Sequence, residues 1–186
     1  MLKVFLGASV ALLLTVGSAA QSPSEVPKQF MDQLKSLMGA YETVVHYSPD
    51  GGETWQTGAP NVVDIALRQK GLLLAEVPRD TSTPGFHLEN YLTYDQYRQV
   101  YRKAVIDDTW GVMDIYEGTI AGDTLILTNL KADTSFPTPT GQMHFRLSIP
   151  LTAGERWQTI EASTDRGETW IPNFKVQYIP LEADTP

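Results

Sequence analysis

The chain has 186 residues, with 14 basic and 22 acidic side chains, a formal net charge of −8 and no cysteine. This acidic balance, without a basic stripe, argues against nucleic acid and anionic membrane surfaces as partners. Because no disulfide can form, the fold must be stabilised by the packing of its core.

The N-terminal residues 1–20 have the pattern of a signal peptide. Lys3 supplies a positive charge, residues 4–16 are apolar, and Gly17-Ser18-Ala19-Ala20 is a small-residue cleavage site. The apolar run is too short to span a bilayer comfortably, so an uncleaved anchor is the minor alternative. No cysteine follows the cleavage site, which excludes a lipid anchor there. We therefore expect a protein exported to the bacterial periplasm or secreted, starting at Gln21, with no membrane span after cleavage.

The mature chain reads as a short linker, residues 21–26, followed by one domain, residues 27–186. Pro27 is suited to the first turn of a helix, and Gly39 is a natural stop. Between them, apolar residues recur at helical spacing, at Phe30, Leu34 and Leu37. One N-terminal helix is predicted.

Everything after Gly39 reads as strands. Ten segments rich in β-branched and aromatic residues are separated by turn signals: 41–47, 62–69, 72–77, 86–94, 97–106, 112–119, 124–130, 142–149, 157–162 and 171–179. Several alternate between apolar and polar residues, as in 142–149, where Phe145 and Leu147 face one way and His144 and Arg146 the other. The pattern predicts an all-β sandwich or an up-and-down antiparallel barrel of about ten strands.

One octet occurs twice, with the pattern S-x-D-x-G-E-T-W. Its shared structural positions are Ser48, Asp50, Gly52 and Trp55 in the first copy and Ser163, Asp165, Gly167 and Trp170 in the second. The aspartate can accept backbone hydrogen bonds, the glycine can take a positive φ, and the tryptophan can cover the turn. We interpret both copies as hairpin turns whose polar groups form hydrogen bonds within the turn itself.

The octet also resembles the Asp-box of sialidase-type propellers. The serines that open the two copies, at positions 48 and 163, are 115 residues apart. Propeller blades repeat about every 40–50 residues. The spacing therefore argues against a propeller.

The stretch Gly39-Ala40-Tyr41, at the join of the predicted helix and first strand, resembles the G-x-W opening of lipocalin-like (calycin) barrels, with Tyr in place of Trp. The whole mature chain looks like a largely uncharacterised exported bacterial family of such barrels. The resemblance implies a closed up-and-down barrel whose interior can hold a small apolar ligand. It brings no established catalytic residues.

An even number of strands would place both octets at one end of such a barrel. Closure makes the first and last strands neighbours, so the octets should lie close together. The helix should then lie at the opposite end, where it can plug the barrel. Trp55 and Trp170 would flank the open mouth, either as turn-packing residues, the favoured interpretation, or as a gate.

The candidate ligand-binding residues are Leu67, Tyr101, Arg102 and Phe145. Two of them belong to a cluster of aromatic and basic residues on adjacent strands: Tyr91, Tyr94, Tyr97, Arg98, Tyr101 and Arg102. Inside the barrel, this cluster would suit a carboxylate or a flat ring. On the outside it would make ordinary cross-strand pairs, which is the commoner arrangement.

No catalytic constellation is present, so we expect no enzyme activity, no cofactor and no metal. Each octet has too few acids for calcium, and Asp107-Asp108 is interpreted as a solvated turn. Neither His87 nor His144 has an evident carboxylate partner.

Three functions remain open. The first is binding of a small apolar or amphipathic molecule, and the second is a haem or nitric-oxide barrel with a histidine ligand. The third is an envelope interaction protein with a solid barrel, whose protein partner the sequence does not identify.

Overall fold

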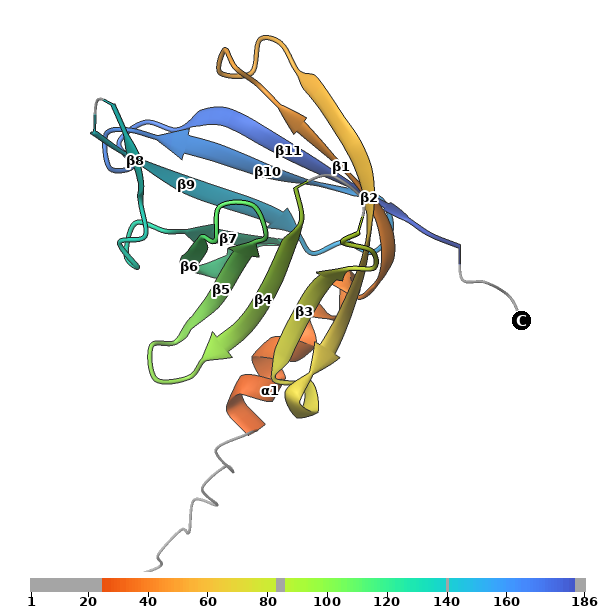
Figure 1. The fold of residues 1–186 in the computed structure, drawn as a ribbon. Helices are drawn as coiled ribbons and strands as arrows, with labels where there is room; N and C mark the ends of the chain where they lie inside the picture. The colour runs from red at the N-terminus through yellow and green to blue at the C-terminus, as the bar shows by residue number, and fades with distance from the viewer. Residues whose placement is uncertain (1–24, 83–85, 140, 183–186) are drawn as a thin grey trace, which may run out of the picture.

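The computed structural model describes residues 25–82, 86–139 and 141–182. They form a closed antiparallel barrel of ten strands with one short N-terminal helix (Figure 1). The fold class predicted from the sequence is therefore confirmed. The predicted signal peptide and residues 21–24 of the predicted linker lie outside the described residues.

All ten predicted strands are present; the second begins six residues earlier than predicted, and the other ends differ by at most three residues. The barrel strands are β1 (Gly39–Tyr47), β2 (Gln56–Arg68), β3 (Leu73–Pro78), β4 (Leu88–Asp95), β5 (Val100–Asp107), β6 (Met113–Ala121), β7 (Thr124–Thr128), β9 (Gly141–Pro150), β10 (Arg156–Ser163) and β11 (Ile171–Pro180). Neighbours in sequence pair in space, except that β7 pairs with β9. The ring closes where β11 pairs with β1, from Tyr41 opposite Pro180 to Tyr47 opposite Phe174.

Two short elements were not predicted. The strand β8 (Phe136–Thr138) lies outside the ring, and among the described strands it pairs with the start of β9 alone. Its three residues include Pro137, so it carries almost no pattern of its own. A single 3-10 turn, η2 (Gln69–Gly71), joins β2 to β3.

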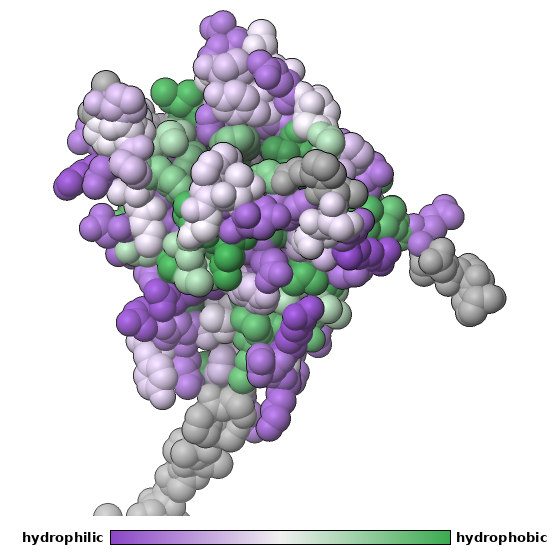
Figure 2. All heavy atoms as spheres, viewed as in Figure 1, coloured by the Kyte–Doolittle hydropathy of each residue, from purple (hydrophilic) through white to green (hydrophobic). Residues whose placement is uncertain are grey.

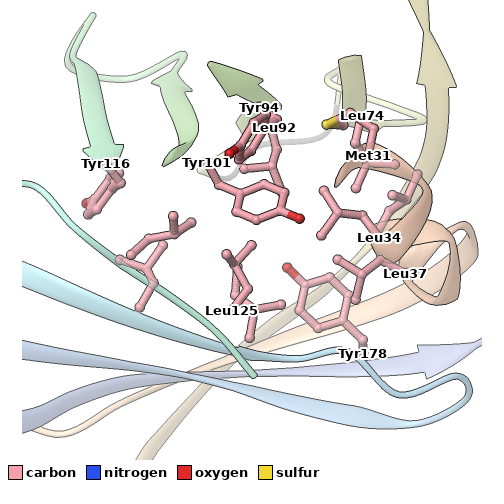
Figure 3. Close-up of a cluster of buried hydrophobic side chains, with 14 of the residues drawn as sticks. Met31, Leu34, Leu37, Leu74, Leu92, Tyr94, Tyr101, Tyr116, Leu125 and Tyr178 are labelled. Atoms are coloured by element: carbon pink, nitrogen blue, oxygen red, sulfur yellow. The ribbon is translucent and has the colours of Figure 1, made fainter. Parts of the chain in front are cut away.

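The N-terminal segment plugs one end of the barrel, which we call the helix end. The helix α1 (Glu25–Met31) continues directly as the 3-10 turn η1 (Asp32–Leu37), and we call these two elements together the plug. Because a 3-10 helix has about three residues per turn, Met31, Leu34 and Leu37 line up on one side. Their side chains are 0%, 0% and 4% exposed. Figure 3 shows them facing Leu74, Tyr101 and Tyr178 on the barrel wall.

Phe30 was predicted to share one helix face with Leu34 and Leu37, but it packs instead against two tyrosines of the barrel wall. Its ring stacks on Tyr94 at a centroid distance of 3.8 Å and meets Tyr101 edge-on. The Tyr101 hydroxyl donates to the Phe30 carbonyl at 2.9 Å. These contacts fix the plug to β4 and β5.

The join between plug and barrel depends on Gly39. Its φ is +146°, and a Cβ there would lie 3.1 Å from the ring of Tyr41. Glycine removes this conflict, so the chain can turn into β1 while Tyr41 folds back, its hydroxyl donating to the Met38 carbonyl. The Gly-x-Tyr sequence is therefore a packing requirement of the first strand.

The opposite end of the barrel carries both octets, and we call it the octet end. The β1–β2 turn projects from it, far from α1 (Figure 1). Gly51 packs against Ile171, and Gly52 against Pro172. These two residues directly follow the second octet, so the octets are neighbours, as the topology predicted.

The loop from β7 to β8 is held down by a buried polar cluster. Asn129, which is 0% exposed, donates to both carboxylate oxygens of Asp114 and to the Thr134 carbonyl. The Thr134 hydroxyl also donates to Asp114. Asn129 in turn accepts the backbone N–H of Phe145 at 2.8 Å. Burial raises the pKa of Asp114, and these hydrogen bonds oppose that shift. The cluster therefore ties the β7–β8 loop to β6 and β9.

Candidate functional site

The barrel interior contains a small cavity with an unusually polar lining. Its volume is about 30 Å³, enough for about two water-sized groups. Six lining residues are polar, namely Glu76, Asn90, Lys103, Arg156, Gln158 and Tyr178, and five are apolar, namely Leu37, Ile65, Leu74, Leu92 and Ile149. Leu37 comes from the plug, so the cavity borders the plug on the side that faces the barrel interior. The core next to the plug is thus charged rather than purely hydrophobic.

Arg156 is the most unusual of these residues. Its side chain lies between two aromatic rings, 4.4 Å from the centroid of Tyr41 and 4.3 Å from that of Tyr178. The residue is 4% exposed, and among the described residues neither Nε nor Nη1 has a hydrogen-bond partner. Buried N–H groups, especially charged ones, are rarely left unpaired because of their desolvation penalty. The guanidinium is held by the rings and retains donors for another group.

Glu76 is the acidic member of the lining and is already engaged. Its carboxylate accepts hydrogen bonds from the Tyr178 hydroxyl at 3.1 Å and from the Asn90 amide at 3.1 Å. Burial, followed by the charge of Glu76, raises the pKa of Tyr178 well above its ordinary value, against the opposing effect of Arg156. Tyr178 therefore stays protonated and donates to Glu76.

Lys103 supplies a second basic group to the same cavity. Its side chain is buried, and burial lowers the pKa of the amine. The negative charge of Glu76 opposes this shift, while the positive charge of Arg156 adds to it. With two basic side chains and one acidic one, the lining is suited to an anion.

The interior becomes more apolar and less buried toward the octet end. The next inward-facing residues along three of the lining strands are Val105, Ile160 and Val176, all only partly buried. Further out, Val45 and Tyr47 share a face of β1 with buried Tyr41, yet are 38% and 40% exposed. We call these five residues the apolar mouth. Figure 2 shows hydrophobic side chains gathered below the projecting β1–β2 hairpin.

The four ligand-binding candidates from the sequence do not line this cavity. Leu67 is partly buried opposite Leu74, and Phe145 packs against Phe136 near the octet end. Tyr101 contacts the plug, and burial raises its pKa to about 12. Arg102 points outward and pairs with Glu117 at 2.8 Å.

The aromatic and basic cluster is divided by strand alternation. Tyr94 and Tyr101 face inward, with ring centroids 5.2 Å apart. Tyr97 is 89% exposed, and Arg98 pairs with Asp95 on the surface. Neither of the two sequence interpretations, wholly inside or wholly outside, holds for the cluster.

The two histidines considered as haem ligands, His87 and His144, do not line the cavity. His87 is buried and its Nδ1 lies 2.7 Å from Asp108, a carboxylate partner that the sequence did not reveal. His144 is 3% exposed and lies on the other face of β9 from Leu147, which points into the barrel. Among the described residues no histidine lines the cavity, whose volume is far below that of a porphyrin. The residues present do not fit a haem.

Asp107 is a capping residue rather than a solvated acid. It is 9% exposed and accepts backbone N–H groups from four successive residues, Thr109 to Val112. Burial by itself would raise the pKa of Asp107, but these four bonds together lower it below its ordinary value. In the parts of the chain that the structure describes, no three His, Asp or Glu side chains gather as a metal site.

The two octets form the same hydrogen-bond network. In the first, Ser48 Oγ accepts the Gly52 N–H at 2.6 Å and donates to Asp50 at 2.9 Å. Asp50 accepts both the N–H and the hydroxyl of Thr54, four residues further along the chain. The second copy repeats every bond with Ser163, Asp165, Gly167 and Thr169. These bonds lower the pKa of Asp50 to about 2 and that of Asp165 further.

Each octet tryptophan packs on its own turn beneath a basic side chain. Trp55 donates to the Gly52 carbonyl at 3.2 Å, and Lys175 Nζ lies 4.0 Å from its ring centroid. Trp170 packs against Gly167 and lies below the Arg146 guanidinium at 4.7 Å. This supports a turn-packing role rather than a gate.

The sequence reading missed Arg156, Lys103 and Glu76. The strand predicted at 157–162 began one residue too late to include Arg156. Lys103 is two residues after Tyr101, so strand alternation alone places both side chains on the same face of β5. A basic residue at an inward position is the pattern that could have identified the cavity.

None of the helices within the described ranges is both long and apolar enough to cross a bilayer. No protein-family model matches the chain, and a search of curated proteins finds no match. Among solved structures, the fold is similar to the crystal structure of Rv2717c from M. tuberculosis, with a TM-score of 0.53 and 14% identity. The match covers 82% of this chain and 97% of that one. At this identity, the similarity shows a shared fold alone.

Proposed function

We propose that the protein is an exported binding barrel for a small amphipathic molecule with an anionic head group. The observation that carries this proposal is Arg156, a buried guanidinium with two nitrogens, Nε and Nη1, that lack a hydrogen-bond partner among the described residues, beside a cavity. A carboxylate is the planar acceptor that a guanidinium binds best. The head group would lie against Arg156, with Lys103 adding a second donor.

The shape of the interior supports a ligand with one charged end. The cavity has room only for a head group, and the plug closes the helix end with fully buried side chains. An apolar tail would have to extend toward the octet end, among Val105, Ile160 and Val176. Access from the octet end therefore suits a fatty-acid-like molecule inserted head first, rather than the wholly apolar ligand that the sequence left open.

Two probes that differ only in head group test the proposal. An anilinonaphthalene sulfonate dye bound to the parent protein should be displaced by decanoate and much less by decanol. Replacing Arg156 by Gln should weaken decanoate binding by about tenfold to a hundredfold, the scale of lost charge-assisted hydrogen bonds. Decanol displacement should change little.

Arg102→Gln is the matched control, because Arg102 is on the outer face and pairs with Glu117. Thermal melting of both variants verifies that they fold. Equal displacement by decanoate and decanol, or an unchanged decanoate affinity in Arg156→Gln, contradicts the proposal. Failure of the parent to take up any dye or ligand would favour the envelope-interaction alternative.

A further inference from the structure

We propose that Lys103 forms a reversible imine with the carbonyl carbon of a ligand whose carboxylate is held by Arg156. The ligand class is then an oxo acid, an aldehyde or ketone that also carries a carboxylate. This proposal rests on the proposed function, since it uses the same anion site.

The position of Lys103 is the geometric basis. It is the one lysine among the described residues that is fully buried, while Lys28, Lys35, Lys70 and Lys131 are exposed and Lys175 is partly exposed. It lies on β5, and Arg156 lies on β10, so the two side chains reach the cavity from different strands. A ligand bound to Arg156 through its carboxylate would thus present its adjacent atoms to the Lys103 amine.

The surroundings favour an amine that can react. Only the neutral amine is a nucleophile, and burial lowers the pKa of Lys103, which increases its neutral fraction. Glu76 opposes this shift, and Arg156 reinforces it. A ligand carboxylate on Arg156 would offset the arginine's charge and remove its contribution, which leaves burial, the largest cause, to lower the pKa of Lys103.

The reaction needs no oxidant and no further reactant. The Lys103 Nζ lone pair attacks the carbonyl carbon, and one of the two protons on that nitrogen passes to the carbonyl oxygen to give a carbinolamine. Loss of that hydroxyl as water leaves a carbon–nitrogen double bond, so amine and carbonyl give imine and water. Glu76 lines the same cavity and can accept the proton from nitrogen and return it to the departing hydroxyl, while Tyr178 and Asn90 hold its carboxylate in place.

Reductive trapping tests the proposal. The mature protein is incubated with glyoxylate and cyanoborohydride, which reduces an imine to a stable amine. Intact mass should increase by one glyoxylic acid less one oxygen atom, and peptide mapping should place the adduct on Lys103. Acetaldehyde, which lacks the carboxylate, should label Lys103 at least about tenfold more slowly, the loss expected for one charge-assisted contact.

Three variants make the result specific. Lys103→Met should remove the mapped adduct, whereas Lys131→Met, which alters an exposed lysine, should not. Arg156→Gln should slow glyoxylate labelling to the rate seen with acetaldehyde. Labelling spread over exposed lysines, or unchanged in Lys103→Met, overturns the imine proposal. If decanoate still binds through Arg156 in that case, the imine alone fails. If decanoate binding is absent as well, the proposed function fails with it.

Discussion

At the scale of single residues, the octets and the cavity use buried polar groups in opposite ways. In each octet, every hydrogen-bonding group of the serine and aspartate side chains has a partner within the same turn. In the cavity, Arg156 has donors without partners. A satisfied group stabilises a turn, whereas an unsatisfied one is a reason to look for a ligand.

Replacing the octet serines tests the structural role of the turns. Ser48 and Ser163 are 2% and 3% exposed, and each accepts one backbone N–H and donates to an aspartate. Ser48→Ala and Ser163→Ala should each lower the free energy of unfolding by roughly 1–2 kcal/mol, the cost of leaving a buried partner unpaired. Urea unfolding measures this, and Thr164→Ala, at an exposed octet position, is the control. Parental stability in both serine variants would contradict the turn network.

The octet aspartates also predict a pH dependence of stability. Hydrogen bonds from Thr54 and Thr169 hold the pKa of Asp50 at about 2 and that of Asp165 lower still. A depressed acid pKa stabilises the folded state above the unfolded value and loses that effect as pH falls through the folded value. Stability should therefore decline between about pH 4 and pH 2. Asp50→Asn and Asp165→Asn should each reduce this slope in urea unfolding. An unchanged slope would show that other acids cause it.

At the scale of elements, the plug has two functions. It fills the helix end through residues spaced by three, and it supplies Leu37 to the cavity wall. A regular α-helix would have brought Phe30 onto this line instead. The change from α1 to η1 thus decides which side chains enter the barrel and frees Phe30 to stack on Tyr94.

Shortening a plug side chain should cost stability without altering the barrel. Leu34 is 0% exposed, so Leu34→Ala should lower the free energy of unfolding by about 2–5 kcal/mol through the cavity it leaves. Gln33→Ala, at the exposed neighbouring position, should unfold like the parent. Circular dichroism during chemical unfolding measures both. A small loss for Leu34→Ala would mean that the plug is not firmly docked.

At the scale of the whole molecule, the barrel is closed at one end and has an apolar mouth at the other. Up-and-down topology brings the first and last hairpins together, and the packing of Gly51 on Ile171 joins them. The ring is closed by the pairing of β1 with β11, and the described residues include no cysteine that could close it with a disulfide. The barrel therefore needs both the first and the last strand of the domain.

Export is predicted from the N-terminal residues. The mature protein isolated from the periplasm or the medium should begin at Gln21, because Ser18 and Ala20 are the small residues that signal peptidase requires. N-terminal sequencing or intact mass checks this. A protein that retained Lys3 would contradict the processing and support the anchor alternative.

The sequence by itself determined the barrel strands, the helix before them and the equivalence of the two octets. These features are local, because alternation, turn residues and a repeated motif can be read within a few residues of each position. Which inward-facing residues meet was decided only by tertiary structure. Glu76 and Lys103 lie two strands apart in the β3–β5 meander, whereas Arg156 comes from β10, and closure of the barrel brings it to the same cavity. The cavity's charge and small volume follow from that closure and from the depth of the plug, which no local pattern encodes.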